Sequence, residues 1–202
     1  MKTIVIKLRT VISIFALSIF ISNSTATAQS LKPNQLKPSI TISGTSTLHD
    51  WESIVESPKG EYVFDEKTIK SLTLNIPVTS IKSKQEEKLM DKKTYEALDS
   101  DKNPTIIFQL TEPATPVISG SEAQVILTGN LTIAGITKKI SIKSSGKKNS
   151  AGAFQFSGVV PLKMSDYKIK PPVAMLGLIK TGDVINIKFD VTIPQQSLLA
   201  TY

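Results

Sequence analysis

Apolar and polar residues alternate along most of the chain beyond residue 38. In the stretch 71–81 every second residue from Leu72 to Val78 is apolar, and in 184–193 the same holds from Ile185 to Ile193. A period of two is typical of a strand with one buried face and one solvated face. Shorter runs with the same period predict further strands at residues 39–46, 52–64, 105–111, 123–133, 138–143 and 153–162.

These predicted strands have one apolar face each, which indicates an antiparallel sheet and not a parallel sheet covered by helices. Gly129 and Gly158 stand in phase with the apolar residues of their strands. Glycine at such positions suits a strand that bends or bulges, and bending lets a sheet close. About eight strands give a bore that holds either packed side chains or one slender ligand. The sequence therefore predicts an all-β, antiparallel barrel of about eight strands.

One segment has a different pattern. Residues 84–98 are rich in helix-forming residues, with Ser83 as the expected N-cap and Glu86 completing a capping box three residues later. Asn103-Pro104 ends the segment. We expect one short helix, at about 84–98, laid across an end or the flank of the sheet.

A second irregular segment is the stretch 163–183, KMSDYKIKPPVAMLGLIKTGD, between two predicted strands. Pro171 and Pro172 cannot donate to a strand ladder, so pairing must lapse there. The following apolar residues surround Gly177 and include Met175, whose flexible side chain adapts to irregular apolar partners. Such a loop can cap the mouth of a barrel or clasp an apolar guest, or it can simply plug the end of the core. The sequence leaves these alternatives open.

The first residues have the parts of a secretory signal peptide. Lys2, Lys7 and Arg9 precede an apolar run that is shorter than the roughly 20 residues of a membrane-spanning helix, and small residues end it at Ala28. We expect residues 1–28 to be removed on export, residues 29–38 to form a flexible lead-in, residues 39–194 to form the barrel domain and residues 195–202 to form a tail. The alternative is an uncleaved membrane anchor. Export without disulfides favours a bacterial periplasm.

Charge and cysteine content exclude several kinds of site. The net charge of +7 falls to +4 without the leader, and the lysines are dispersed, so we expect no nucleic-acid partner. Transient contact with an anionic membrane surface stays open. With no cysteine and His49 as the single histidine, we expect neither a metal site nor a cofactor. His49 either packs or hydrogen-bonds near Trp51, contacts a ligand, or serves in catalysis, and we expect no enzyme activity.

Three stretches resemble the YceI-like family. They are the strand, turn, helix and strand from Leu72 to Leu110, the hairpin LTGNLTIAGITKKISIK from Leu127 to Lys143, and the closing loop and strand from Lys163 to Ile193. The resemblance implies an exported protein with a lipocalin-like barrel that holds a polyisoprenoid or similar lipid. The region GTSTLHDWESIVES departs from the opening strand common in that family.

The barrel and the resemblance together lead us to expect a periplasmic protein that holds a long apolar chain, polyisoprenoid or quinone-like. The rival expectation is a structural or interaction barrel with a filled core and no ligand. The sequence does not fix the identity of the lipid, its direction of travel or the oligomeric state. The residues expected to contact the ligand are inward-facing strand residues, residues at the mouth and residues at the polar head: Leu74, Ile76, Phe108, Leu127, Leu131, Phe154, Phe156, Ile187 and Phe189 in the bore; Met164, Met175 and Leu176 at the mouth; and His49, Trp51 and Tyr167 at the head.

Overall fold

The computed structural model describes residues 33–65, 67–85 and 87–194. The expected leader and tail lie outside these residues, and the following account concerns the described ones. The strands are β1 (Asn34–Leu36), β2 (Ser39–Ser46), β3 (Trp51–Val55), β4 (Lys59–Asp65), β5 (Thr68–Pro77), β6 (Ile81–Ser83), β7 (Thr105–Leu110), β8 (Val117–Ser119), β9 (Glu122–Ile133), β10 (Ile136–Lys148), β11 (Phe154–Lys163), β12 (Val173–Ala174) and β13 (Ile179–Ile193). The helices are α1 (Lys88–Ala97) and the 3-10 turns η1 (Val78–Ser80), η2 (Met164–Tyr167) and η3 (Met175–Gly177).

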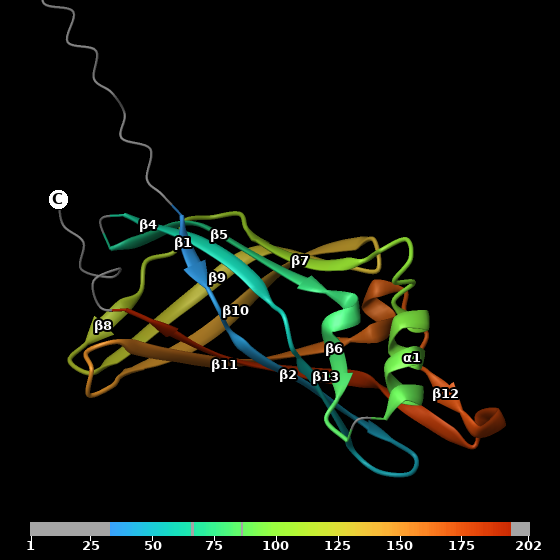
Figure 1. The fold of residues 1–202 in the computed structure, drawn as a ribbon. Coiled ribbons are helices and arrows are strands. Elements are labelled where there is room, and N and C mark those ends of the chain that lie inside the picture. The colour runs from blue at the N-terminus through green and yellow to red at the C-terminus, as the bar shows by residue number, and fades with distance from the viewer. Residues whose placement is uncertain (1–32, 66, 86, 195–202) are drawn as a thin grey trace, which may run out of the picture. The chain divides into compact units, whose positions relative to one another are not determined.

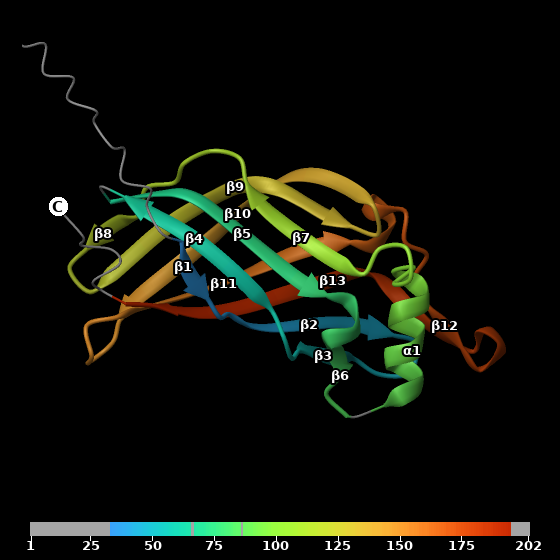
Figure 2. The ribbon, with the colours of Figure 1, turned by 45° about the horizontal axis from the view of Figure 1, so that its top comes forward.

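The strands form one curled, antiparallel sheet (Figures 1 and 2). Its order is β1-β4-β5-β7-β9-β10-β11-β13-β2-β3-β6, with β8 added beside β9 and β12 beside β13. β1 pairs with β4, and β2 pairs with β13. Since Lys37 and Pro38 alone separate β1 from β2, the first strand brings the β4 end of this order close to β2, near its other end. The sheet thus wraps around a common interior, as predicted.

The structure has thirteen strand segments where about eight strands were expected. One predicted strand, 52–64, is broken in two between Val55 and Lys59, where Pro58 lies. Proline has no N–H for the ladder, so it favours a break there. The short strands β1, β6, β8 and β12, which were not predicted, account for the rest. The class of fold is the predicted one.

The predicted facing of the strands is also found. Leu74 of β5 and Ile187 of β13 face the interior, whereas Ile126 of β9 and Val159 of β11 are exposed on the outside. The period of two therefore places one apolar set inward on strand after strand.

Two boundaries differ from the expectation. The lead-in was expected to be flexible to residue 38, but Asn34–Leu36 form β1 and the Leu36 side chain is buried against Gly60. The helix was expected from residue 84 with Ser83 as its N-cap, but α1 begins at Lys88 after Glu87. Ser83 cannot cap it because Ser83 belongs to β6 and pairs with Ser53 of β3. Ser83 thus belongs to the sheet, and the helix begins five residues after it.

Candidate functional site: an apolar cavity in the barrel

A cavity of about 240 Å³ lies inside the barrel. Nearly all of its wall is aliphatic or aromatic, and the polar side chains that reach it include Ser53, Thr94 and Ser144. Its volume exceeds that of an engineered protein cavity of roughly 150 Å³ that stays dry and binds benzene. The interior is therefore not packed solid, and its wall offers few polar groups. The strand residues in the wall include Ile40, Ile42, Leu72, Leu74, Ile76, Ile106, Phe108, Leu127, Leu131, Ile140, Ile142, Phe156, Val160, Leu162, Ile185, Ile187 and Phe189.

Glycines in the wall make room for aromatic rings. A Cβ atom at Gly158 would lie 2.6 Å from Cζ of Phe189, the residue directly opposite on β13. A Cβ at Gly129 would lie 2.6 Å from Cζ of Phe108. Gly44 and Trp51 form a similar pair. Because each ring lies over a glycine along the wall, it adds apolar surface while leaving the bore unfilled.

The cavity lies between two packed clusters. At the end of the barrel near β1, β4 and β8, Tyr62, Phe64, Phe154 and Phe156 belong to one cluster of buried residues, in which the two phenylalanine rings of β11 are 6.1 Å apart. At the other end, α1 lies over the barrel (Figure 1), and Leu98, just after it, is buried. The helix thus covers one end of the cavity, as the sequence led us to expect.

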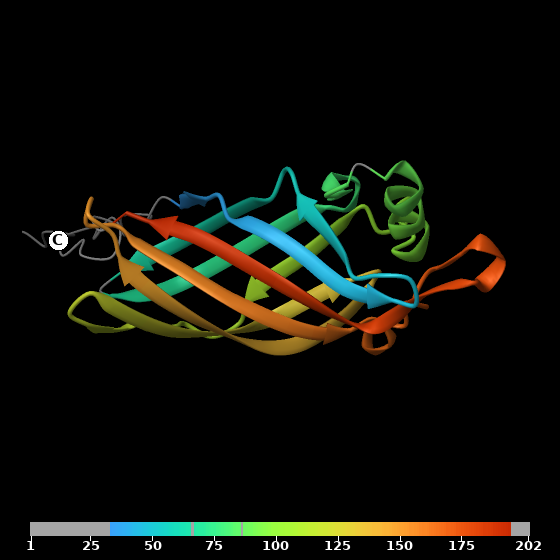
Figure 3. The same ribbon diagram turned by 90° about the horizontal axis from the view of Figure 1, so that it is seen from below.

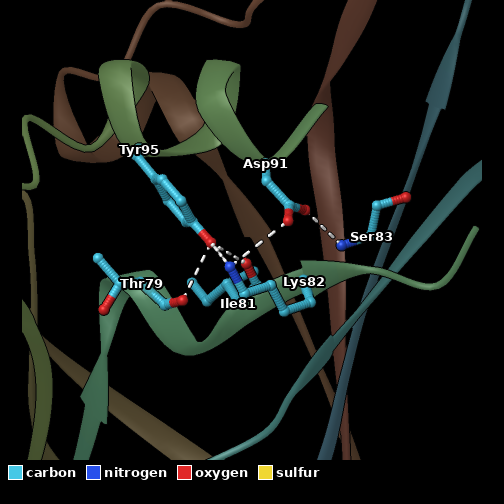
Figure 4. Close-up of polar contacts among 6 residues, drawn as sticks. All are labelled: Thr79, Ile81, Lys82, Ser83, Asp91 and Tyr95. Carbon is cyan, nitrogen blue, oxygen red and sulfur yellow. Dashed lines mark hydrogen bonds and ion pairs between the residues drawn. The ribbon is translucent and has the colours of Figure 1, made fainter. Parts of the chain in front are cut away.

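Polar contacts fix α1 to the segment below it (Figure 4). The Tyr95 hydroxyl lies 3.0 Å from the carbonyl oxygens of both Thr79 and Ile81, to which it donates, and it accepts a 2.7 Å hydrogen bond from Lys82 Nζ. One turn earlier, Asp91 accepts a 2.6 Å hydrogen bond from the Ser83 amide. The hydrogen bond to Tyr95, with the nearby Asp91 carboxylate, raises the pKa of Lys82, so this lysine stays charged.

Tyr167 of η2 lies in the wall at the same end of the cavity and is only 2% exposed. Its hydroxyl has no hydrogen-bond partner among the described residues. Burial, and to a lesser degree the nearby Asp166 carboxylate, raises the pKa of Tyr167. The phenol therefore keeps its proton. It is a buried polar group whose hydrogen-bonding capacity is unused.

Most of the residues expected to meet a ligand lie in the cavity wall. Whether they contact a ligand remains a prediction. The predicted residues that line the cavity are Leu74, Ile76, Phe108, Leu127, Leu131, Phe156, Met164, Ile187, Phe189, Trp51 and Tyr167.

Four predicted residues lie elsewhere. Phe154 faces inward but is buried in the packed cluster beyond the cavity. His49 lies in the exposed loop between β2 and β3, where Nδ1 is 2.7 Å from the Asp50 carbonyl oxygen. Met175 and Leu176 are 64% exposed and fully exposed at the tip of the β12–β13 hairpin. In this structure Met175 and Leu176 neither line nor plug the cavity, because β12 pairs with β13 and the hairpin extends outward.

Other wall residues were missed by the sequence reasoning. Leu36 stands alone among polar residues before Pro38, and nothing in its surroundings signals a strand. Leu98 is the last residue of the expected helix, 84–98, and no residue of that helix was assigned to the cavity. Ile169 alternates with Tyr167 between exposed lysines, and this short period of two was a usable signal.

No group of three histidine, cysteine, aspartate or glutamate side chains in 33–65, 67–85 or 87–194 is placed to hold a metal ion. In the same part of the chain no helix has the length and apolar character needed to cross a bilayer.

The fold and the cavity define a lipocalin-like antiparallel barrel with an apolar interior. The chain belongs to the YceI-like family, because residues 23–193 match the model of the YceI-like domain. A UPF0312 protein of Pseudomonas paraeruginosa is 32% identical over 118 residues, which are 55% of this chain and 59% of the relative. A UPF0312 protein of Pseudomonas aeruginosa is 31% identical over the same shares. The chain thus spans about three fifths of the length of these curated relatives.

Solved structures show the same fold. BcnA of Burkholderia cenocepacia has a TM-score of 0.58 at 19% identity, covering 77% of this chain and 96% of BcnA. A polyisoprenoid-binding domain from Saccharophagus degradans has a TM-score of 0.59 at 11% identity, covering 78% of this chain and 95% of that domain. The YceI protein of Campylobacter jejuni has a TM-score of 0.52 at 19% identity, covering 90% and 98%.

Proposed function

We propose that this protein binds a lipid with a long apolar chain, polyisoprenoid or quinone-like, inside the barrel. The observation that carries the proposal is the apolar cavity of about 240 Å³ between two packed clusters. At about 24 cal/mol per Å³, an empty cavity of this size forfeits roughly 6 kcal/mol of packing. Domains are stable by about 5–15 kcal/mol in total, so such a void is expensive unless a ligand fills it.

The shape of the cavity favours a long ligand over a compact one. Its wall runs from Leu36 and Phe64 at one end to Leu98 and Ile169 at the other. The β9 residues in the wall run from Val125 to Ile133, about 27 Å along the strand, which is long enough for several isoprene units in a row. Burial of each CH₂ contributes about 0.8 kcal/mol before the cost of ordering the chain. The polyisoprenoid-binding domain from Saccharophagus degradans, a structural neighbour, supports this choice of ligand.

We place the polar end of the ligand at Tyr167, whose buried hydroxyl would turn toward the cavity to meet it. A buried hydroxyl without a partner costs about 1–3 kcal/mol, and a carbonyl or hydroxyl oxygen on the ligand would supply the partner. This end of the cavity would then hold the head of the ligand, with its chain running toward Phe156.

We also propose that the protein works in the bacterial periplasm as a binder and not as an enzyme. The leader-like residues before Gln29 and the lack of cysteine support the location. The apolar wall supports binding, because it offers few groups for acid–base or nucleophilic chemistry.

The test is native mass spectrometry of protein purified from its own host, with organic extraction of whatever it carries. We expect a bound lipid with a prenyl chain, and uptake of such a lipid by delipidated protein. Apo protein together with no uptake would overturn the proposal and favour the filled, structural barrel.

Two neighbouring residues of β9 give a matched pair of variants. Leu127→Trp places a large ring in the cavity, whereas Ile126→Trp places it on the exposed face of the same strand. We expect Leu127→Trp to reduce prenyl-lipid uptake on the order of 10-fold or more, and Ile126→Trp to leave uptake unchanged. Equal uptake by both variants would contradict binding in the cavity.

A further inference from the structure

The β12–β13 hairpin ends in an exposed apolar tip, which we call the apolar finger and define as residues 173–178. Val173, Met175 and Leu178 are 53%, 64% and 79% exposed, and Leu176 is fully exposed. Leu48, in the β2–β3 loop, is 65% exposed. The finger projects beyond the barrel at the same end as α1 (Figure 3). This much exposed aliphatic surface at one tip is typical of an interaction site.

The base of the finger is held in place by hydrogen bonds. The Thr47 hydroxyl donates to the Leu178 carbonyl at 3.1 Å and accepts from the Lys180 amide at 3.1 Å. The Thr47 amide donates to the Lys180 carbonyl at 3.0 Å, and the Thr181 amide donates to the Pro172 carbonyl at 3.1 Å. The tip is therefore presented outward from a fixed base, and Leu48 follows the residue that fixes it.

Two apolar residues at the tip adopt a strained backbone conformation. Met175 and Leu176 have φ of 51° and 57°, in the left-handed region that glycine and asparagine adopt more readily. Since both side chains are exposed, the folding of the barrel gains nothing from their apolar character. Strained residues without a folding role point to a function of the tip itself.

Positive charge surrounds the base of the finger. Lys168, Lys170 and Lys180 are exposed on the segments that lead into and out of it. Asp166 lies 3.7 Å from Lys138, and Asp183 accepts hydrogen bonds from the Ser165 amide and hydroxyl. Asp166 is thus paired with Lys138, and the three lysines outnumber the remaining nearby carboxylates, Asp50 and Asp183. An apolar tip above a cationic base is the composition of a segment that sits in the interface of an anionic bilayer.

We propose that the apolar finger docks this protein on an anionic phospholipid bilayer, with the tip among the acyl chains and the lysines at the headgroups. A second copy of the chain is a poorer occupant, because a twofold contact through this tip would bring the lysines of one base against those of the other. Met164, Tyr167 and Ile169, which line the cavity, lie four to nine residues before the finger. Docking would therefore bring that end of the cavity toward the membrane. This inference goes beyond lipid binding in the barrel and can fail independently of it.

The absence of cysteine from the sequence allows a local test. Leu176→Cys in the finger and Val117→Cys in β8, at the opposite end of the barrel (Figure 1), each take one environment-sensitive fluorophore. The protein is purified in the form that its producing cells process, and vesicles contain phosphatidylethanolamine and phosphatidylglycerol at about three to one. We expect a blue shift for the probe at position 176 and none at position 117. Vesicles of phosphatidylcholine alone should give a weaker shift, since they lack the negative charge.

Flotation with the same vesicles tests the unlabelled protein. We expect Leu176→Ser with Leu178→Ser to lower the bound fraction on the order of 10-fold or more, and the matched pair Val117→Ser with Ile118→Ser to have no effect. Sedimentation velocity is run on each variant. The proposal would be overturned if the wild type did not float, or if both pairs of substitutions lowered flotation equally. It would also be overturned if the wild type were a dimer that dissociates in the finger variant, because the finger would then serve self-association. Prenyl-lipid uptake, measured separately, should be unchanged in the finger variant, which keeps the two proposals distinguishable.

Discussion

Single glycines decide how much of the barrel interior stays open. Phe189 and Phe108 are large enough to fill the bore, yet each ring lies along the wall over Gly158 or Gly129. The sequence placed both glycines in phase with the inward residues, which we interpreted as a sign of bends. Their second consequence, room for a ring on a neighbouring strand, depends on strand register. The register becomes known only when the partner strands are known.

Gly158→Ala tests this arrangement. The new methyl group would lie 2.6 Å from Phe189 Cζ and 2.7 Å from the Lys143 carbonyl oxygen, so the ring must turn into the cavity and the backbone must shift. We expect a loss of about 1–3 kcal/mol in the free energy of unfolding and weaker prenyl-lipid binding, measured by urea denaturation and fluorescence titration. Ser157→Ala, on the outer face next to it, should change neither. Unchanged binding by Gly158→Ala would show that the ring does not border the ligand.

Tyr167→Phe tests the unpaired hydroxyl. In the protein without ligand, removal of a buried group that lacks a partner should leave the free energy of unfolding unchanged or slightly raised. Affinity for a prenyl lipid with a carbonyl or hydroxyl head should fall by about 1–2 kcal/mol. Affinity for the hydrocarbon of the same length should not change. Isothermal titration with both ligands measures the difference, and an equal loss for both would mean that Tyr167 contributes packing alone.

At the scale of elements, strands with a long run of alternating apolar and polar residues were predictable, and the interruptions of strands were not. β9 and β13 follow from alternation alone, because each has one buried face. β1 could not be predicted, since its three residues have no period and are ordered by pairing with β4. The start of α1 was misplaced for a related reason: the pairing of β6 with β3 overrides the N-cap preference of Ser83.

Tyr95→Phe should loosen α1 where it covers the cavity. The hydroxyl donates to the carbonyls of Thr79 and Ile81, and its removal leaves these groups and Lys82 without that partner. We expect a loss of about 1–2 kcal/mol in the free energy of unfolding, faster amide exchange in α1 and faster ligand release. Hydrogen exchange and stopped-flow release measure these effects. Lys93→Ala, which removes an exposed ion pair with Glu96 on the same helix, is the control and should have little effect on any of the three.

The contact between β13 and η2 should depend on pH. The hydrogen bonds from the Ser165 hydroxyl and amide lower the pKa of Asp183 below its ordinary value of 3.8. The carboxylate therefore stabilises the fold above that value, and the contribution is lost as the pH falls through the lowered pKa. We expect Asp183→Asn to remove this part of the acid sensitivity, measured as the urea midpoint from about pH 7 down to about pH 2. Ser165→Ala should remove part of the same sensitivity. An Asp183→Asn profile parallel to the wild type would contradict the assignment.

At the scale of the whole molecule, a long apolar cavity makes affinity depend on ligand length. If prenyl chains lie along the bore, each added isoprene unit buries five more carbons, which offer roughly 3–4 kcal/mol before the cost of ordering. Affinity should rise with each unit and then level off when the chain reaches the aromatic cluster of Phe64, Phe154 and Phe156. A series of prenyl alcohols, titrated against delipidated protein, measures this dependence.

The length at which affinity levels off distinguishes the interior from the surface. An open surface groove would let a longer chain extend past its end without penalty, so affinity would level off at a length that Leu127→Trp does not change. A chain enclosed in the barrel must stop at a packed end, and a ring placed at Leu127 of β9 should move the limit to shorter chains. Affinity that is independent of chain length in both proteins would place the lipid outside the bore. The cavity would then be a packing defect and not a binding site.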